Sequence, residues 1–171
     1  FGWEEKRGKY ASQTGPVRRG VGMATFCYKT GVYPISLETA SARMILNQDG
    51  SMQLQLGATA IGQGADTVFS QMASETTGIS FDKIYIVSSQ DTDTAPFDTG
   101  AYGSRQTYVS GKAVRKCGEL FKEKILDYAS YILKRSQEEL DVDHDQIVEK
   151  GTGKDLLALS ELAVTAFYSL D

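Results

Sequence analysis

Residues 52–77 read MQLQLGATAIGQGADTVFSQMASETT, and this stretch decides the fold. Apolar residues alternate with glutamine from Met52 to Leu56, which predicts a half-buried strand. From Gly64 to Thr77 the apolar residues recur at helical spacing instead, and Gly78 stands where helices often end on a left-handed glycine. The stretch therefore predicts a strand, a glycine-rich loop and a helix in succession.

Two strand-like stretches precede Met52. Ala40 to Asn47 is joined to the Met52–Leu56 strand through Asn47-Gln48-Asp49-Gly50, a turn-forming sequence, so we expect these two strands to form a hairpin. Val17 to Tyr28 is rich in β-branched and aromatic residues, and it predicts a further strand that ends before Gly31.

Downstream of the helix, Phe81 to Ser88 contains a short apolar run that suits a buried strand. Gln90 to Gln106 is then a long polar loop, and loops of this length in compact domains are more often functional than idle. From about Thr107 to Glu139 the apolar residues recur at steps of three and four, which predicts a long amphipathic helix.

The last 31 residues carry weaker patterns. Asp141 to Asp145 predicts an acidic connector, Ile147 to Leu159 fits neither period, and Ser160 to Leu170 predicts the start of an N-capped helix. The fold class expected from all these patterns is α/β with α+β character: a mixed sheet with a hairpin, two glycine-rich loops that each lead into a helix, and one long helix. We divide the chain into a mobile lead-in at 1–16 that Trp3 anchors, a core segment at 17–140, and a connector with a further helix at 141–171.

Composition and charge exclude several classes of protein. The 171 residues are 41% apolar and 23% charged, which is typical of a globular chain. The net charge is −4 and the basic residues are spread out, so neither nucleic acid nor an anionic membrane is an expected partner. Cys27 and Cys117 lie far apart with only His144 as a further metal-binding type, which predicts reduced thiols of a cytoplasmic protein and no zinc site. The chain starts at Phe1 rather than Met, which predicts a segment of a longer polypeptide.

The loop at 57–64 reads GATAIGQG and is the first candidate site. Its glycines allow close approach of the backbone, Gln63 adds two donors and an acceptor, and the following helix offers unpaired N–H groups. The pattern suits an anion or a polar heterocycle, while the alternative is a simple strand-to-helix turn. Neither the dinucleotide fingerprint GxGxxG nor the P-loop pattern GxxxxGK[ST] is present.

The loop at 91–107 is the second candidate site and reads DTDTAPFDTGAYGSRQT. Gly103 permits a bend, and hydroxyl, guanidinium and amide groups follow it at the start of a helix, which suits phosphate or a pterin. The alternative is a capped loop in which Arg105 pairs at the surface with Asp91, Asp93 or Asp98. The aspartates also suggest calcium as a minor option, although the EF-hand spacing is missing.

The two loops occur in an order that resembles the molybdenum-binding (molybdopterin) subunits of the xanthine dehydrogenase and aldehyde oxidase family. The similar motifs are GQG at 62–64 and DTDTAPFDTGAYGSRQTYVSGKAV at 91–114, preceded by RRGVG at 18–22 and LNQDGSMQLQLG at 46–57. The similarity extends from about Arg18 to Lys124 and more faintly to the end of the chain.

The resemblance implies a molybdopterin–molybdenum cofactor whose metal has no protein side chain as a ligand, so no metal-binding residue is expected here. Gln63 and Gly64 are then expected to contact the cofactor, and a second group is expected to wrap the pterin: Gly103, Ser104, Arg105, Gln106 and Thr107. Bacterial relatives often carry the cytosine dinucleotide form, whose added phosphate Arg105 is expected to suit. A looser match assigns Val32 and Tyr33 to the substrate channel, although Tyr33 is equally suited to be a core or rim aromatic.

The chain departs from the family in three ways. It has no acidic residue at Ala60, no late GxGE motif to supply the glutamate base, and none of the upstream residues that complete the metal site. Separately, it has no cysteine pattern for iron–sulfur clusters. No catalytic residue is therefore expected in this chain, and the iron–sulfur clusters and FAD are expected on partner subunits or domains. The implied function is part of a molybdenum hydroxylase, xanthine dehydrogenase-like, that hydroxylates purines or aldehydes, with the chain alone inactive; the alternative is a noncatalytic α/β ligand-binding or assembly module.

Overall fold

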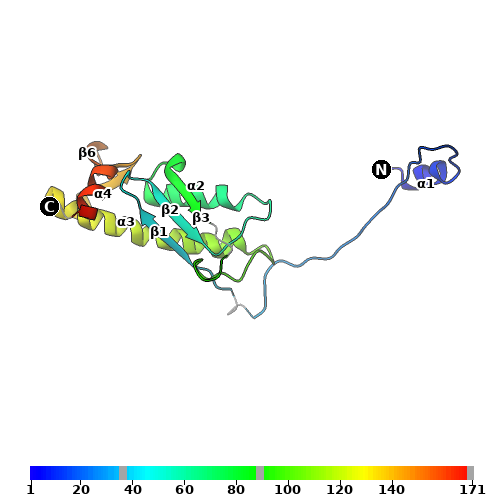
Figure 1. Cartoon of the computed structure of the whole chain (residues 1–171), viewed down its shortest axis with the longest axis horizontal. Coiled ribbons are helices and arrows are strands. Elements are labelled where there is room, and N and C mark those ends of the chain that lie inside the picture. The colour runs from blue at the N-terminus through cyan, green and yellow to red at the C-terminus, as the bar shows by residue number, and fades with distance from the viewer. Residues whose placement is uncertain (35–37, 88–90, 169–171) are drawn as a thin grey trace.

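The structure is a computed structural model that describes residues 1–34, 38–87 and 91–168. Two three-stranded sheets lie along one long helix, α3 (Gly111–Leu133), whereas the short helix α1 (Trp3–Ala11) lies apart from them (Figure 1). The predicted mixed α/β fold with one long helix is confirmed, but the strands form two sheets rather than one.

The first sheet has the order β1-β2-β3 and comprises β1 (Ala42–Leu46), β2 (Met52–Leu56) and β3 (Ile84–Val87). β1 and β2 pair antiparallel in the predicted hairpin, whereas β2 and β3 pair parallel. Two parallel neighbours need a crossover connection, which is supplied by the predicted helix, α2 (Ala65–Thr77), and a 3-10 turn, η2 (Phe81–Lys83).

The parallel pair determines where the two glycine-containing loops lie. Parallel strands end at the same edge of a sheet, so the segments that follow β2 and β3 leave the sheet side by side. The first candidate loop follows β2 directly, and the second follows β3. The topology alone therefore brings two stretches together that are about 40 residues apart in the sequence.

The core lies between this sheet and the helices α2 and α3. The side chains of Met52, Leu54 and Leu56 on β2 are fully buried, as the alternation with glutamine predicts. α2 packs on β3, α3 packs on β1, and the two helices pack on each other, so both cover the same face of the sheet.

The second sheet corrects the expected acidic connector. Residues 140–158 form β4 (Leu140–Asp143), β5 (Gln146–Glu149) and β6 (Lys154–Ala158), followed by α4 (Leu159–Tyr168). On β4 the apolar residues are buried and the aspartates face outward. The alternation of apolar and polar residues that predicts a strand is present, but the two aspartates made the segment resemble an acidic connector. His144 and Asp145 both have positive φ, the conformation of a two-residue hairpin turn.

Residues on both sides of position 140 pack in one hydrophobic cluster. Val142, Ile147 and Leu159 belong to the same hydrophobic cluster as the residues of β2 and α2. The C-terminal sheet is therefore part of the core rather than a connector. The expected helix beginning near Ser160 is confirmed as α4, with Leu170 outside the described residues.

The predicted helix at 107–139 is shorter than expected. It opens with a π-helical turn, η3 (Gln106–Ser110), continues as α3, and ends at Leu133, because Lys134 adopts a left-handed conformation. A separate 3-10 turn follows, η4 (Gln137–Glu139), which Ser136 caps. In the described part of the chain no helix is both long enough and apolar enough to cross a membrane.

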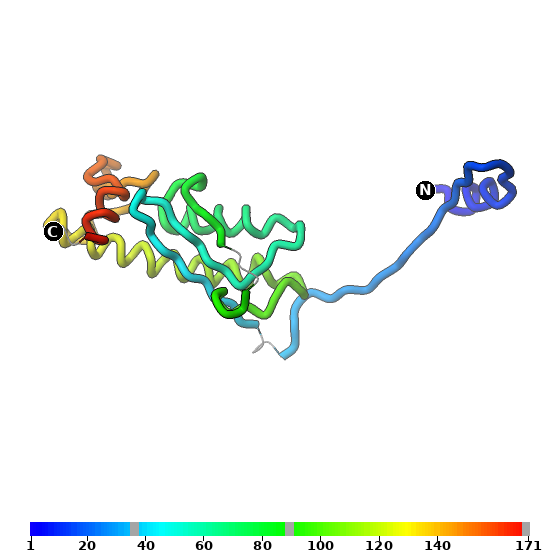
Figure 2. The backbone as a smooth tube through the Cα atoms, viewed as in Figure 1, coloured from blue at the N-terminus to red at the C-terminus, as the bar shows by residue number. Residues whose placement is uncertain are grey.

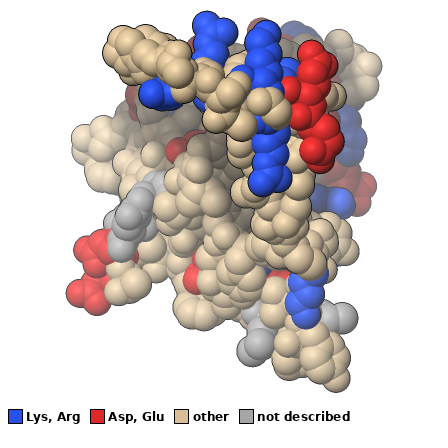
Figure 3. All heavy atoms as spheres, turned by 90° about the vertical axis from the view of Figure 1, so that its right-hand side faces the viewer, with Lys and Arg blue, Asp and Glu red and all other residues tan. Residues whose placement is uncertain are grey.

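The N-terminal segment differs most from expectation. The expected mobile lead-in contains α1, which carries acidic residues in its first turn and a lysine in its last, an arrangement that suits the helix dipole. The strand expected at 17–28 is absent among the described residues: the segment runs as extended chain between α1 and the sheets (Figure 2) and has no strand beside it. Figure 3 shows basic and acidic side chains close together at the α1 end of the molecule.

Asp145 links the two halves of the core. Its carboxylate accepts hydrogen bonds from the Ser80 backbone N–H at 2.8 Å and the Ser80 hydroxyl at 2.7 Å, and it lies 3.2 Å from the Lys83 ammonium. Partial burial alone raises the pKa of this carboxyl, but the hydrogen bonds from Ser80 and the charge of Lys83 outweigh it and hold the pKa below its ordinary value.

We expect Asp145→Asn to lower the stability of the chain at neutral pH but not in acid. A carboxyl whose folded pKa is depressed stabilises the fold above its unfolded pKa, and this contribution is lost as the pH falls through the folded pKa. The difference in urea midpoint between wild type and variant should therefore be largest near pH 7 and shrink below about pH 4. Asp155→Asn, on exposed β6, is the control; a pH-independent difference for Asp145→Asn would contradict the assignment.

Candidate functional site

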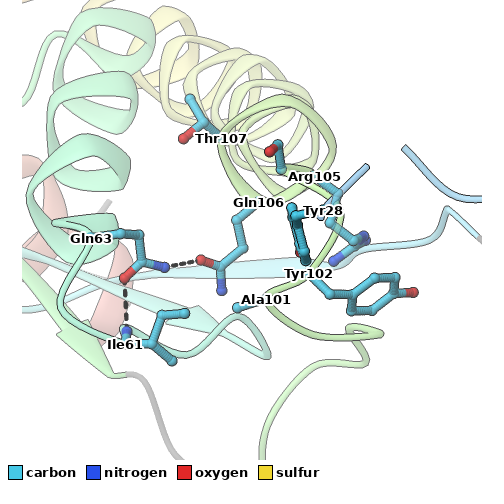
Figure 4. A pocket seen from close by; sticks show the side chains of 9 residues that line it. Tyr28, Ile61, Gln63, Ala101, Tyr102, Arg105, Gln106 and Thr107 are labelled. Carbon is cyan, nitrogen blue, oxygen red and sulfur yellow. Dashed lines mark hydrogen bonds between the residues drawn. The ribbon is translucent and has the colours of Figure 1, made fainter. Parts of the chain in front are cut away.

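A pocket of about 350 Å³ lies where the two glycine-containing loops meet. Its walls come from both loops and from the extended segment before β1 (Figure 4). The residues that line it are Tyr28, Ile61, Gln63, Ala101, Tyr102, Ser104, Arg105, Gln106 and Thr107. Five of the seven predicted cofactor residues thus line one pocket, whereas Gly64 and Gly103 do not line it.

Gly57 allows the two loops to approach each other. A Cβ atom at this position would lie 2.0 Å from the Pro96 carbonyl oxygen and 2.9 Å from the backbone N of Asp98. Real side chains cannot tolerate such distances to backbone atoms, so any residue larger than glycine must push the second loop away. The glycine that follows β2 is therefore required by packing and not by turn geometry.

Two side-chain amides connect the loops across the pocket. The Gln106 Nε2 donates to the Thr59 carbonyl oxygen at 2.9 Å, the Gln63 Nε2 donates to the Gln106 Oε1, and the Ile61 backbone N–H donates to the Gln63 Oε1 at 2.7 Å. Figure 4 shows the carboxamides of Gln63 and Gln106 pointing toward each other. The first turn of the helical segment after the second loop is thus joined to the backbone of the first loop.

Arg105 is buried and holds the second loop internally. Its Nε lies 2.6 Å from Glu38 Oε2, its Nη1 lies 2.5 Å from Asp98 Oδ1 and 2.7 Å from the Gly100 carbonyl oxygen, and its Nη2 donates to the Thr39 carbonyl oxygen at 2.7 Å. The residue is 2% exposed. Four of its five N–H donors are thereby committed to acceptors within the protein.

The alternative prediction, that Arg105 pairs with an aspartate at the surface, is correct for the partner Asp98 but wrong for the surface location. Asp98 is a partner, but the pair is buried: both side chains are at most 1% exposed, and Glu38 rather than Asp91 or Asp93 is the second carboxylate. Burial disfavours the charged guanidinium, yet hydrogen bonds to Glu38 and Asp98 outweigh this and raise the Arg105 pKa above its ordinary value. Ser110 also donates to Asp98 at 2.7 Å, so the carboxylate is held on both oxygens.

Gly103 is held by the extended segment. Its N–H donates to the Tyr28 hydroxyl, and its carbonyl oxygen accepts from the Gly31 N–H at 2.7 Å. The side chain of Val32 also lies against it, whereas Tyr33 is 87% exposed. Neither Val32 nor Tyr33 lines the pocket, so their place in a substrate channel stays a prediction.

The remaining polar groups of the pocket are open to a ligand. Ser104 and Thr107 are exposed, and in the described part of the chain their hydroxyls have no hydrogen-bond partner. Gly64 caps the N-terminus of α2 with positive φ, next to Gln63. Amides and hydroxyls that both donate and accept match the mixed donor and acceptor edge of a pterin, so these residues fit such a group.

Sequence reasoning missed three residues that shape the site. Tyr28 and Glu38 come from segments without a functional pattern, and only the folded chain places them beside the second loop. Thr59 belongs to the first candidate loop, but nothing in the sequence singled out its carbonyl oxygen as the acceptor of Gln106. Asp98 carried a signal, because it lies seven residues before Arg105 in the same loop, but nothing in the sequence showed that the pair is buried.

Comparison with known proteins gives consistent matches over nearly the whole chain. Residues 1–170 match a family described as a molybdopterin cofactor-binding domain. The chain is 46% identical over 170 residues to a putative xanthine dehydrogenase molybdenum-binding subunit of Escherichia coli, covering 98% of this chain and 22% of that protein. It is 27% identical to the carbon monoxide dehydrogenase large chain of Hydrogenophaga pseudoflava, covering 96% of this chain and 21% of that protein.

Solved structures agree with the sequence matches. The reconstituted carbon monoxide dehydrogenase from Oligotropha carboxidovorans superposes with a TM-score of 0.68 and 31% identity, covering 78% of this chain and 16% of that one. The chain therefore spans about a fifth of the length of the curated relatives it matches.

We expect Gly57→Ala to destabilise the chain by about 1–3 kcal/mol, because the added methyl group forces the second loop away from the first. Urea unfolding measures the effect. Gly22→Ala is the matched control, since a Cβ there meets no atom within 4 Å. Equal midpoints for the two variants would show that the loops do not pack as described.

Arg105→Gln should cost about 3–5 kcal/mol of unfolding free energy, because it leaves the carboxylate of Asp98 buried without a counter-charge. Arg115→Gln is the control: Arg115 and Glu119 form an exposed pair on α3, and such pairs contribute less than about 1 kcal/mol. If the two substitutions shift the urea midpoint equally, the Arg105 cluster is not the buried network that its geometry indicates.

Proposed function

Because the chain belongs to the molybdopterin cofactor-binding domain family, we propose that its two glycine-containing loops hold one side of a molybdopterin–molybdenum cofactor. The resemblance first drawn from the order of the two loops is confirmed at the level of the family. Within this proposal Gln63 and Gly64 contact the cofactor from the first loop. Gly103, Ser104, Gln106 and Thr107 contact it from the second.

The convergence of both loops on one pocket carries the proposal. Gln63 from one loop and Ser104, Gln106 and Thr107 from the other line the same cavity, and their groups are neutral amides and hydroxyls. Arg105 also lines it, with its charge paired to Glu38 and Asp98. The amides and hydroxyls form directional hydrogen bonds with a heterocycle without placing a net charge beside it. The protein thus contributes position and hydrogen bonding, and the bound cofactor supplies the redox chemistry.

The whole polypeptide is proposed to be the molybdenum-binding part of a xanthine dehydrogenase-type hydroxylase, with purines or aldehydes as substrates. The glutamate base of the family lies outside this chain, since no GxGE motif occurs in it. Iron–sulfur clusters and FAD on partner subunits or domains complete the electron path in this proposal. The isolated chain is accordingly expected to bind or shape the cofactor but not to turn over substrate.

The cytosine dinucleotide form of the cofactor remains a proposal that rests on the resemblance to bacterial enzymes. We do not assign Arg105 to the added phosphate of the cofactor. Four N–H donors of Arg105 already bind acceptors in the protein, on Glu38, Asp98, Gly100 and Thr39. The exposed hydroxyls of Ser104 and Thr107 are better placed to meet a ligand at the mouth of the pocket.

The molybdenum-to-protein ratio of the full natural gene product, purified from its own host, tests the proposed function. We expect near-stoichiometric metal in the wild type and a loss of roughly tenfold in metal retention in Gln63→Ala, because the variant lacks an amide on the cofactor. Gln71→Ala, an exposed glutamine on α2, is the control and should retain the metal. Metal-free wild-type protein from a cofactor-competent host would favour a noncatalytic binding or assembly module instead.

A further inference from the structure

The carboxamides of Gln63 and Gln106 form a directed chain with a fixed polarity. At one end the Ile61 N–H can only donate, and it donates to the Gln63 Oε1 at 2.7 Å. At the other end the Thr59 carbonyl can only accept, and it accepts from the Gln106 Nε2 at 2.9 Å. The two backbone groups therefore determine which way each amide faces.

This polarity decides what Gln63 offers to a ligand. Its oxygen is engaged by Ile61, and one of its two N–H groups donates to the Gln106 Oε1. The second N–H of Gln63 remains, and Gln63 lines the pocket. If the amide were turned over, its NH₂ group would face the Ile61 N–H and two donors would oppose each other.

Gln106 is suited to hold this arrangement. It is buried, at 7% exposed, and it lies in the π-helical turn η3, which is anchored to α3. Gln63 by contrast lies in an exposed loop, so without a partner its side chain is free to rotate. Gln106 therefore restricts the rotation of the Gln63 side chain.

We propose that Gln106 is a positioning residue that orients the Gln63 amide, so that Gln63 presents an N–H donor to an acceptor atom of the ligand in the pocket. This inference rests on the proposed function for the identity of the ligand, but the hydrogen-bonded chain itself does not. Gln106 then contributes to ligand binding mainly through Gln63, and its own contact with the ligand is secondary.

The chain of amides is tested first without any ligand, by NMR of the side-chain NH₂ groups of glutamine in the ¹⁵N-labelled protein. We expect the Gln63 signals to differ from those of exposed Gln71, and to move to the Gln71 positions in Gln106→Met, which keeps the length of the side chain but has no acceptor. An unmoved Gln63 signal in a variant whose other signals are unchanged would overturn the proposal.

A second variant covers the case in which Gln106→Met does not fold. Gln106→Glu keeps an acceptor toward Gln63 and makes it charged, and charge-assisted hydrogen bonds are shorter and stronger. The second oxygen of the new carboxylate replaces the Nε2 group, so the variant loses the hydrogen bond to the Thr59 carbonyl oxygen while the one from Gln63 is strengthened. One Gln63 N–H proton should therefore move further downfield than in the wild type. A Gln63 signal identical to that of the wild type would show that residue 106 is not its partner.

The role in ligand binding is tested by molybdenum retention in the full natural protein, with wild type, Gln63→Ala, Gln106→Met and the double variant. We expect Gln106→Met to reduce retention roughly tenfold, and the double variant to lose no more than Gln63→Ala alone. Losses that multiply in the double variant would show that Gln106 acts independently. Full retention by Gln63→Ala would instead contradict the proposed function, whatever the NMR result.

Discussion

The parallel pairing of β2 with β3 is the constraint on which the site depends. It forces a helical crossover between the two strands and sends both following segments out of the same edge of the sheet. The pocket is built at that edge, where open α/β sheets commonly bind their ligands. A hairpin connection in place of α2 would have sent the two loops to opposite ends of the sheet.

Two kinds of polar interaction have different roles at this edge of the sheet. The buried charges of Arg105, Glu38 and Asp98 fix the backbone of the second loop, and they are withdrawn from solvent. The neutral amides of Gln63 and Gln106 lie at the pocket and connect the two loops. The charged side chains therefore hold the structure of the site, and in the proposed function the uncharged side chains contact the ligand.

Periodicity predicted the elements whose inner and outer faces differ in polarity. The strand β2 and the helices α2 and α3 followed directly from it. The hairpin with β1 followed from the turn sequence between the strands, and the start of α4 followed from an N-cap pattern. β4 was missed because two aspartates on its outer face resembled a connector. The stretch at 17–28 was predicted as a strand from its residue types, but a strand also needs a neighbour to bond with, and none lies beside it among the described residues.

The candidate site was predictable only in part, for a similar reason. Gln63 and the residues from Gly103 to Thr107 lie in glycine-containing loops next to helix starts, and this local pattern marks them. Glu38 lies 67 positions from Arg105, and no local pattern connects them. Contacts of this kind depend on the tertiary fold, so a single sequence does not reveal them.

The helix α3 is long enough to link the local unfolding of the two halves of the molecule. Its 23 residues, at about 1.5 Å each, extend roughly 35 Å from the second loop to the C-terminal sheet. The same helix thus packs on both sheets, and a single hydrophobic cluster extends along it. We therefore expect the two halves to be coupled in their local opening, so that disruption of the β4–β6 hairpins also speeds amide exchange in the second loop. Trimming the chain after α3 would expose the apolar residues of the helix that pack on β4.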